Sequence, residues 1–133
     1  MNEGKEYLFF NPKPYVPASL SELHDWLLTM IGGAPTFVDD RGIYPERSLD
    51  TEFACLTEGF GIVRKKLGED RYAAAIDLAA RAKALFAADP DEDNGKTMEG
   101  IGLIYEMMDV VQSTRKRRVA TKQADDEGEV TGD

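Results

Sequence analysis

Residues 48–68 have the sequence SLDTEFACLTEGFGIVRKKLG, and this stretch decides the fold. Its large apolar residues recur at spacings of four and three, which places them on one side of an α-helix of about five turns. They are Leu49, Phe53, Leu56, Phe60, Val63 and Leu67. Ser48 or Asp50 can cap the start, and Gly68 stands where helices commonly end. We therefore predict a helix over 49–67 in a mainly α protein.

Two glycines, Gly59 and Gly61, lie inside this predicted helix. Each costs about 1 kcal/mol relative to alanine in a helix interior. Close approach of a neighbouring helix to the glycine backbone is the simplest compensation, and a ligand against the backbone is the alternative. Neither this pair nor Gly100 and Gly102 follows a strand, so we predict no phosphate-binding loop.

Three further helices are predicted, over 19–31, 69–88 and 97–115. The first begins at a capping box formed by Ser19 and Glu22, in which each side chain satisfies a free backbone amide. The other two each carry two adjacent apolar stripes, an arc wide enough to be buried on two sides. In 69–88 the second stripe is Ala75, Leu78, Ala82 and Leu85, and in 97–115 it is Leu103, Met107 and Val110. This last stripe is either buried in the bundle or faces a partner.

The rest of the chain carries weaker signals. Residues 1–18 hold an aromatic run followed by prolines, which predicts an extended arm, and residues 36–45 form either a loop or a hairpin. We expect a single helical domain over 1–115 and a disordered polar tail over 116–133. The predicted architecture is a small antiparallel bundle of about four helices with an irregular N-terminal arm that has room for a short strand.

Composition excludes several functions. The 133 residues include 16 lysines and arginines against 25 aspartates and glutamates, a formal charge of −9. This balance disfavours nucleic acid as a partner, because a general nucleic-acid surface needs a basic footprint. One cysteine, Cys55, and one histidine, His24, exclude an internal disulfide and a Cys/His-rich zinc site. The sequence shows no secretory signal and no apolar run long enough to span a membrane. We therefore expect a cytoplasmic protein without membrane contact, metal or cofactor.

The acidic segment 89–99 resembles a calcium-binding loop in its first half only. If Asp89 is the first ligand, Asp91 and Asp93 fall at the third and fifth positions, as such a loop requires. The glycine and Glu99 then fall out of register, and the same residues are typical of any link between helices. Calcium or small-ligand binding through this loop is therefore an alternative function.

Other candidate groups have ordinary structural explanations. The Asp39-Asp40-Arg41-Gly42 segment is typical of a surface turn, His24 of a partly buried helix position, and Cys55 of a small core residue. The basic cluster 115–118 suits the negative end of a helix dipole. Because no set of histidine, cysteine or carboxylate groups converges from separate segments, we expect no catalysis.

These features favour an acidic interaction protein, of the immunity, antitoxin or inhibitor kind, that binds and sequesters or inhibits a basic protein partner. Acidic side chains would steer the partner and apolar side chains would anchor it. The predicted partner-binding residues are Asp89, Asp91, Glu92, Asp93, Glu106, Met107, Asp109 and Val110. A homo-oligomeric structural or adaptor module, with a homodimer formed through the second stripe of 97–115, is the other alternative.

Overall fold

The structure is a computed structural model of the chain, and it describes residues 15–38 and 47–125. Within these residues every regular element is a helix, which confirms the mainly α prediction. The helices are α2 (Leu20–Gly33), α3 (Leu49–Ile62), α4 (Arg64–Leu67), α5 (Glu69–Ala87) and α6 (Lys96–Asp125).

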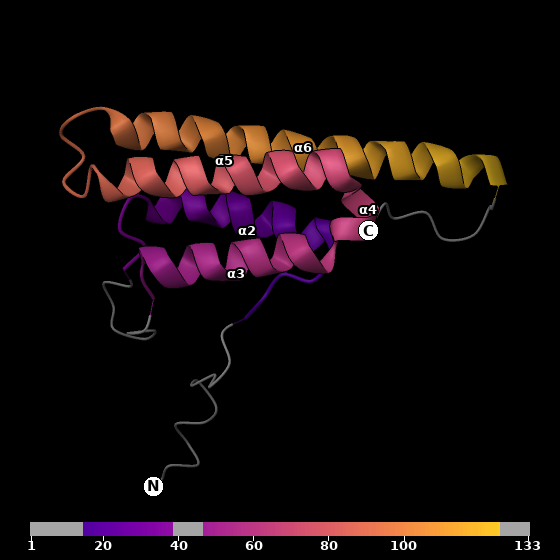
Figure 1. Cartoon of the computed structure of the whole chain (residues 1–133), viewed down its shortest axis with the longest axis horizontal. Coiled ribbons are helices and arrows are strands. Elements are labelled where there is room, and N and C mark those ends of the chain that lie inside the picture. Colours follow the sequence, from indigo (N-terminus) through magenta and orange to yellow (C-terminus); the bar gives the residue numbers. More distant parts are fainter. Residues whose placement is uncertain (1–14, 39–46, 126–133) are drawn as a thin grey trace, which may run out of the picture.

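The four long helices lie side by side in two layers (Figure 1). One layer holds α2 and α3, the other holds α5 and α6, and successive long helices run in opposite directions. The one-turn helix α4 links α3 to α5 at one end of the molecule. At that same end α6 continues beyond the other helices (Figure 1).

The core forms where the predicted apolar stripes of the helices meet. Leu56, Phe60 and Leu67 from the 49–67 stripe are buried, as are residues from every other long helix. Three aromatic rings meet at the end of the core opposite α4. The ring of Phe37 lies edge-on to Phe53 and Phe86, with centroid separations of 5.9 and 5.5 Å. Edge-on contact is a favourable geometry for such rings.

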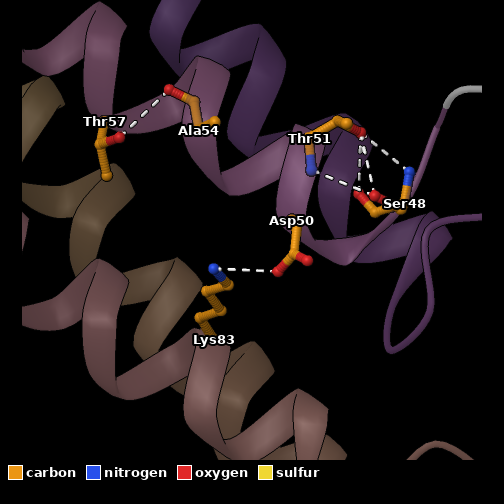
Figure 2. Close-up of polar contacts among 6 residues, drawn as sticks. All are labelled: Ser48, Asp50, Thr51, Ala54, Thr57 and Lys83. Atoms are coloured by element: carbon orange, nitrogen blue, oxygen red, sulfur yellow. Dashed lines mark hydrogen bonds and ion pairs between the residues drawn. The ribbon is translucent and has the colours of Figure 1, made fainter.

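The starts of α2 and α3 are capped by the predicted serines, although Glu22 reaches the amide of Ala18 and not that of Ser19. Ser19 Oγ accepts the Glu22 amide at 3.1 Å, and the Glu22 carboxylate accepts the amide of Ala18. In α3 the exchange is reciprocal, because Ser48 Oγ accepts the Thr51 amide and Thr51 Oγ1 accepts the Ser48 amide (Figure 2). Such caps satisfy amides that the first turn leaves without partners.

One ion pair joins the two layers beside the α3 cap. Asp50 Oδ1, in the first turn of α3, lies 3.1 Å from Lys83 Nζ of α5 (Figure 2). Asp50 therefore acts between helices, while Ser48 alone caps α3.

The 49–67 helix is interrupted, which corrects the prediction of one continuous helix. α3 ends at Ile62, Val63 adopts φ −97° and ψ 15°, and α4 resumes at Arg64. Gly59 and Gly61 weaken this last turn of α3 because glycine is a poor helix former. Val63 and Leu67 are nevertheless buried, so the apolar stripe stays continuous across the break.

Two other predicted boundaries were wrong. The 19–31 helix continues through Gly32 and Gly33, and the 97–115 helix continues to Asp125 instead of giving way to a disordered tail at 116. Residues 116–125 lack apolar periodicity, but they contain no glycine or proline and consist largely of good helix formers. Of the predicted 1–18 arm only residues 15–18 are described, and they form no regular element; residues 39–45 and 126–133 also lie outside the described residues.

Candidate functional site

A groove runs between α5 and α6 on the outer face of their layer. It consists of two shallow hollows of about 420 and 380 Å³, which meet at Arg81. The first hollow is lined by Ala74, Asp77, Leu78, Arg81, Glu106, Asp109 and Val110. The second is lined by Arg81, Ala84, Leu85, Glu99 and Leu103. From residue 74 to residue 85 the groove is about 16 Å long, or three helical turns.

Apolar side chains form the floor of this groove. Leu78 and Leu103 are largely buried and Leu85 and Val110 are half-buried, so each presents an edge to solvent. They belong to the second apolar stripes of the two helices. The groove therefore combines a partly covered apolar strip with the length of a short helix, which suits a helix-in-groove contact.

The rim of the groove is acidic. Asp77, Glu99, Glu106 and Asp109 are all exposed. Arg81 is the single cation among the lining residues, and its Nη1 atom lies 3.3 Å from Asp77 Oδ2 one turn away on α5. Such an exposed pair contributes little energy, but it offsets one of the four acids. The remaining charge attracts a basic ligand and repels an acidic one.

The structure places three of the predicted partner-binding residues in this groove and rejects a fourth. Glu106, Asp109 and Val110 line one hollow. Met107 is fully buried, so the expectation that it anchors a partner is wrong. The Met107 side chain lies in the core between the helices, where a flexible thioether fills irregular space. Val110, one turn later, remains as the apolar candidate.

Asp89 is also corrected, because its carboxylate serves the fold. The residue is 1% exposed. Its Oδ1 atom accepts the amides of Asp93 and Asn94 at 2.8 and 3.2 Å, and its Oδ2 atom accepts the amide of Thr97 at 2.9 Å. Thr97 is the second residue of α6, whose amide has no partner within the helix. Asp89 therefore closes the 89–96 loop and places a negative charge at the positive end of the α6 dipole.

The ionised form of Asp89 is favoured by these contacts. Burial alone would raise the pKa of Asp89, but the hydrogen bonds from Thr97, Asp93 and Asn94 outweigh it and hold the pKa below its usual value. The calcium alternative required this carboxylate as its first ligand, and it is already bonded to three backbone amides. Asp91, Glu92 and Asp93 are exposed beside it.

We expect Asp89→Asn to lower Tm by roughly 5 °C at pH 7. The side-chain amide of asparagine has one acceptor oxygen where the carboxylate has two. Its NH₂ group replaces the second oxygen and faces a backbone N–H donor. Because the folded-state pKa is lowered, the contribution of the carboxylate is complete above the unfolded pKa of about 3.9 and is lost as the pH falls through the folded value.

Thermal unfolding followed by circular dichroism at several pH values measures this effect. The gap in Tm between the wild type and Asp89→Asn should begin to narrow below about pH 4 and close only below the lowered pKa of folded Asp89. Asp91→Asn removes an exposed acid from the same loop and should leave Tm unchanged at pH 7. An equal loss in both variants would contradict the assigned role of Asp89.

A third hollow, of about 250 Å³, lies between α2 and the start of α3. It is lined by Tyr15, Glu22, Asp25, Trp26, Thr29, Arg47 and Glu52. Burial raises the pKa of Glu52, and Arg47, whose Nε atom lies 3.7 Å from its carboxylate, opposes the shift. A raised pKa suits a general acid, and the hollow is lined by the hydroxyl groups of Tyr15 and Thr29 but not by His24 or Cys55.

The remaining single groups behave as the sequence predicts. His24 is half-buried on α2. Cys55 is buried and unpaired, and burial, together with Glu52 and Glu58, raises the pKa of its thiol. A raised pKa keeps the sulfur in its unreactive thiol form. The Asp39–Gly42 segment lies outside the described residues.

Sequence reasoning missed several groove residues. Asp77 and Arg81 carry no motif, Glu99 was considered only as part of the acidic 89–99 segment, and only the pairing of α5 with α6 brings the three together. The floor residues were visible as second apolar stripes, so the signal existed for Leu85 and Leu103. What the stripes could not show is which of their members lie at the edge of the helix contact.

Comparisons with family models, with curated proteins and with solved structures found no match. Among the described residues, no helix is long and apolar enough to cross a membrane. The same residues contain no group of three or more histidine, cysteine or carboxylate side chains placed to hold a metal ion.

Proposed function

We propose that this protein binds a basic, amphipathic segment of a partner protein in the α5–α6 groove and acts by covering it. The observation that carries the proposal is the combination of a partly exposed apolar floor with a rim of four acids. Sequestration or inhibition of the partner follows from occupancy alone and needs no catalytic group. This is the mode of action expected of an immunity-like protein or inhibitor.

The groove favours a helix as the bound element. Its length of about 16 Å accommodates three turns, and apolar side chains at positions i, i+3 or i+4 and i+7 would reach its floor. Full burial of one leucine or valine contributes about 1.5–3 kcal/mol, so two or three such anchors carry most of the affinity. Lysine or arginine side chains beside them would face Asp77, Glu99, Glu106 and Asp109.

A synthetic peptide of 14 residues tests the proposal without knowledge of the natural partner. We specify an amphipathic helix with leucines along one face and lysines on the other. Calorimetry should show saturable binding, and NMR shift changes should concentrate on the floor residues Leu78, Leu85, Leu103 and Val110. A peptide with glutamates in place of the lysines should not bind, because the rim repels it.

Neutralising the rim should weaken this binding about tenfold. Glu106→Gln with Asp109→Asn removes two charges that steer and hold the lysines, and charged rim groups act mainly on the association rate. The matched control is Glu58→Gln with Asp25→Asn, which removes the same charge from exposed positions on α3 and α2. The control should bind within about twofold of the wild type.

Equal weakening in the two double variants would contradict the proposal, because it would reveal attraction to net charge alone. Shift changes confined to α2 and α3 would also contradict it. Sedimentation velocity on the free protein should show a monomer at every concentration used. A dimer that is lost in the presence of the peptide would assign the groove to a second copy of the chain instead.

A further inference from the structure

Two basic runs that are far apart in the sequence meet at one end of the molecule. Residues 64–66 (Arg-Lys-Lys) form most of α4, and residues 115–118 (Arg-Lys-Arg-Arg) lie on α6. The Arg117 guanidinium donates from Nη2 to the Lys66 carbonyl oxygen at 3.0 Å, across 51 residues of chain. Figure 1 shows α4 beside α6, where α6 passes the ends of the other helices. We call these two runs together the basic end.

Part of the positive charge of the basic end stays at the surface, although several of its arginines have partners within the fold. Arg64 is held by Glu69, with Nη2 to Oε1 at 2.8 Å, and it also lies over the Tyr72 ring at 4.3 Å. Lys65, Lys116 and Arg117 are exposed, and Arg117 uses one nitrogen to hold the two helices together. The juxtaposition therefore presents several positive charges on two rigid elements.

The overall negative charge does not cancel this end. Charges interact strongly only within a Debye length of about 8 Å at physiological salt. Glu69 at the start of α5 is paired with Arg64. Asp109, the last acid of α6 before the basic run, lies seven residues before Lys116, or about 10 Å away along the helix axis. The expectation that net charge disfavours nucleic acid treated the chain as uniform, whereas the structure separates an acidic groove from a basic end.

The chemistry of the basic end favours phosphates over a lipid surface. Arginine presents a planar fork that matches phosphate oxygens, and lysine adds a mobile point charge. A helix that lies in a membrane interface needs a broad apolar face. Residues 115–121 have one large apolar side chain, Val119, and it is half-buried.

We propose that the basic end binds the phosphate backbone of a nucleic acid without reading its sequence. The exposed cations lie on two adjoining helices, so they can contact successive phosphates of one strand. This surface is separate from the α5–α6 groove, and its activity does not depend on the partner proposed for that groove.

Fluorescence anisotropy with a labelled 20-bp DNA duplex and a labelled 20-base RNA tests the proposal. About four phosphate contacts on the duplex predict that affinity falls roughly 10²-fold between 50 and 200 mM KCl. Lys65→Gln with Lys116→Gln should weaken binding at 50 mM KCl about tenfold and reduce the salt slope by about two. Shuffling the base sequence should leave the affinity unchanged.

The matched control is Lys83→Gln with Lys96→Gln, which removes two positive charges from elsewhere on α5 and α6. It should bind both probes within about twofold of the wild type. Far-ultraviolet circular dichroism should show the same helix content in all variants, because Lys65, Lys96 and Lys116 are exposed and an exposed ion pair such as Lys83–Asp50 contributes little to stability.

Three outcomes would overturn the proposal. They are binding to neither nucleic acid at 50 mM KCl, equal weakening by the two double variants, and binding to anionic lipid vesicles but not to nucleic acid. Each is independent of the peptide experiment on the groove, which probes acids on the other part of α6. Failure of one proposal therefore leaves the other standing.

Discussion

Gly100→Ala should destabilise the protein by about 2 kcal/mol and lower Tm by roughly 8–12 °C. A Cβ atom at this position would lie 2.6 Å from Cε1 and 2.8 Å from Cζ of the Phe86 ring. That ring cannot easily retreat, because it is 1% exposed and lies against Phe37 and Phe53. Overpacking of this kind costs about 1–3 kcal/mol or more, which exceeds the helix propensity gained on replacing glycine.

Gly102→Ala is the matched control for this change. It lies two residues further along α6, where a Cβ atom would meet nothing within 4 Å. The substitution should therefore stabilise the protein by about 0.5–1 kcal/mol through helix propensity alone. Chemical denaturation gives both free energies of unfolding. The opposite signs of the two effects are the test, and stabilisation by Gly100→Ala would contradict the close packing of α6 on Phe86.

A second variant locates the clash. Phe86→Leu removes the ring and should itself destabilise the core, since it leaves unfilled volume. Combined with Gly100→Ala, however, it should cost less than the sum of the two single changes, because the methyl group occupies part of that volume. Neighbouring sites couple in this way, whereas distant sites add.

The apolar stripe of 49–67 could be predicted because burial follows helical periodicity directly. Phe53, Phe60 and Leu67 lie in the core as their spacing requires, even though the backbone breaks at Val63. The break itself could not be predicted, because the cost of two glycines has to be weighed against packing that the sequence does not display. Periodicity also failed at 116–125, where helix propensity alone extends α6 past the last apolar residue of its stripes.

The candidate site could be predicted only in part, because one residue type serves several purposes. Asp89 and Asp109 are both acids near an apolar stripe, yet the first caps α6 inside the structure and the second lies on an exposed rim. Met107 and Val110 belong to one stripe, and a difference of one turn decides whether the side chain is in the core. The groove depends on the contact between α5 and α6, which no local pattern specifies.

The basic end required the same kind of information. In the sequence, no second basic run adjoins residues 115–118. The positive charges of this run alone are few beside a net charge of −9. The chain path through α3 and α4 brings residues 64–66 alongside, which is a consequence of topology. Charge counted over a whole chain is therefore a poor guide to the surface that a partner meets.

Gly59→Ala should destabilise the protein by about 1–3 kcal/mol, and the loss should begin at the segment before α2. A Cβ atom here would lie 2.7 Å from the Pro17 carbonyl oxygen and 3.1 Å from Cδ2 of Leu23. The first contact is with backbone, so the residues around Pro17 must move as a unit. The expected compensation was a neighbouring helix; at Gly59 the closest atoms belong to the extended segment that enters α2, with Leu23 of α2 behind them, and Gly61 has no close neighbour.

Trp26 gives this prediction a local reporter. It is the one tryptophan of the chain, and its ring lies 5.4 Å from the ring of Tyr15, two residues before Pro17. Displacing residues 15–17 should expose the indole and shift its emission to longer wavelength before global unfolding begins. Gly61→Ala is the control, because a Cβ atom there meets nothing within 4 Å, and it should stabilise by about 0.5 kcal/mol with unchanged emission.

The two readouts separate local from global effects. If Gly59→Ala lowers the free energy of unfolding without altering native emission, the strain is absorbed by α3 or by Leu23 and not by the entry segment. If both Gly59→Ala and Gly61→Ala stabilise the protein, the close approach of Pro17 to α3 is wrong. The pairs Gly59/Gly61 and Gly100/Gly102 each hold one closely packed and one open position. The sign of the stability change on each substitution to alanine therefore measures packing that helix propensity cannot predict.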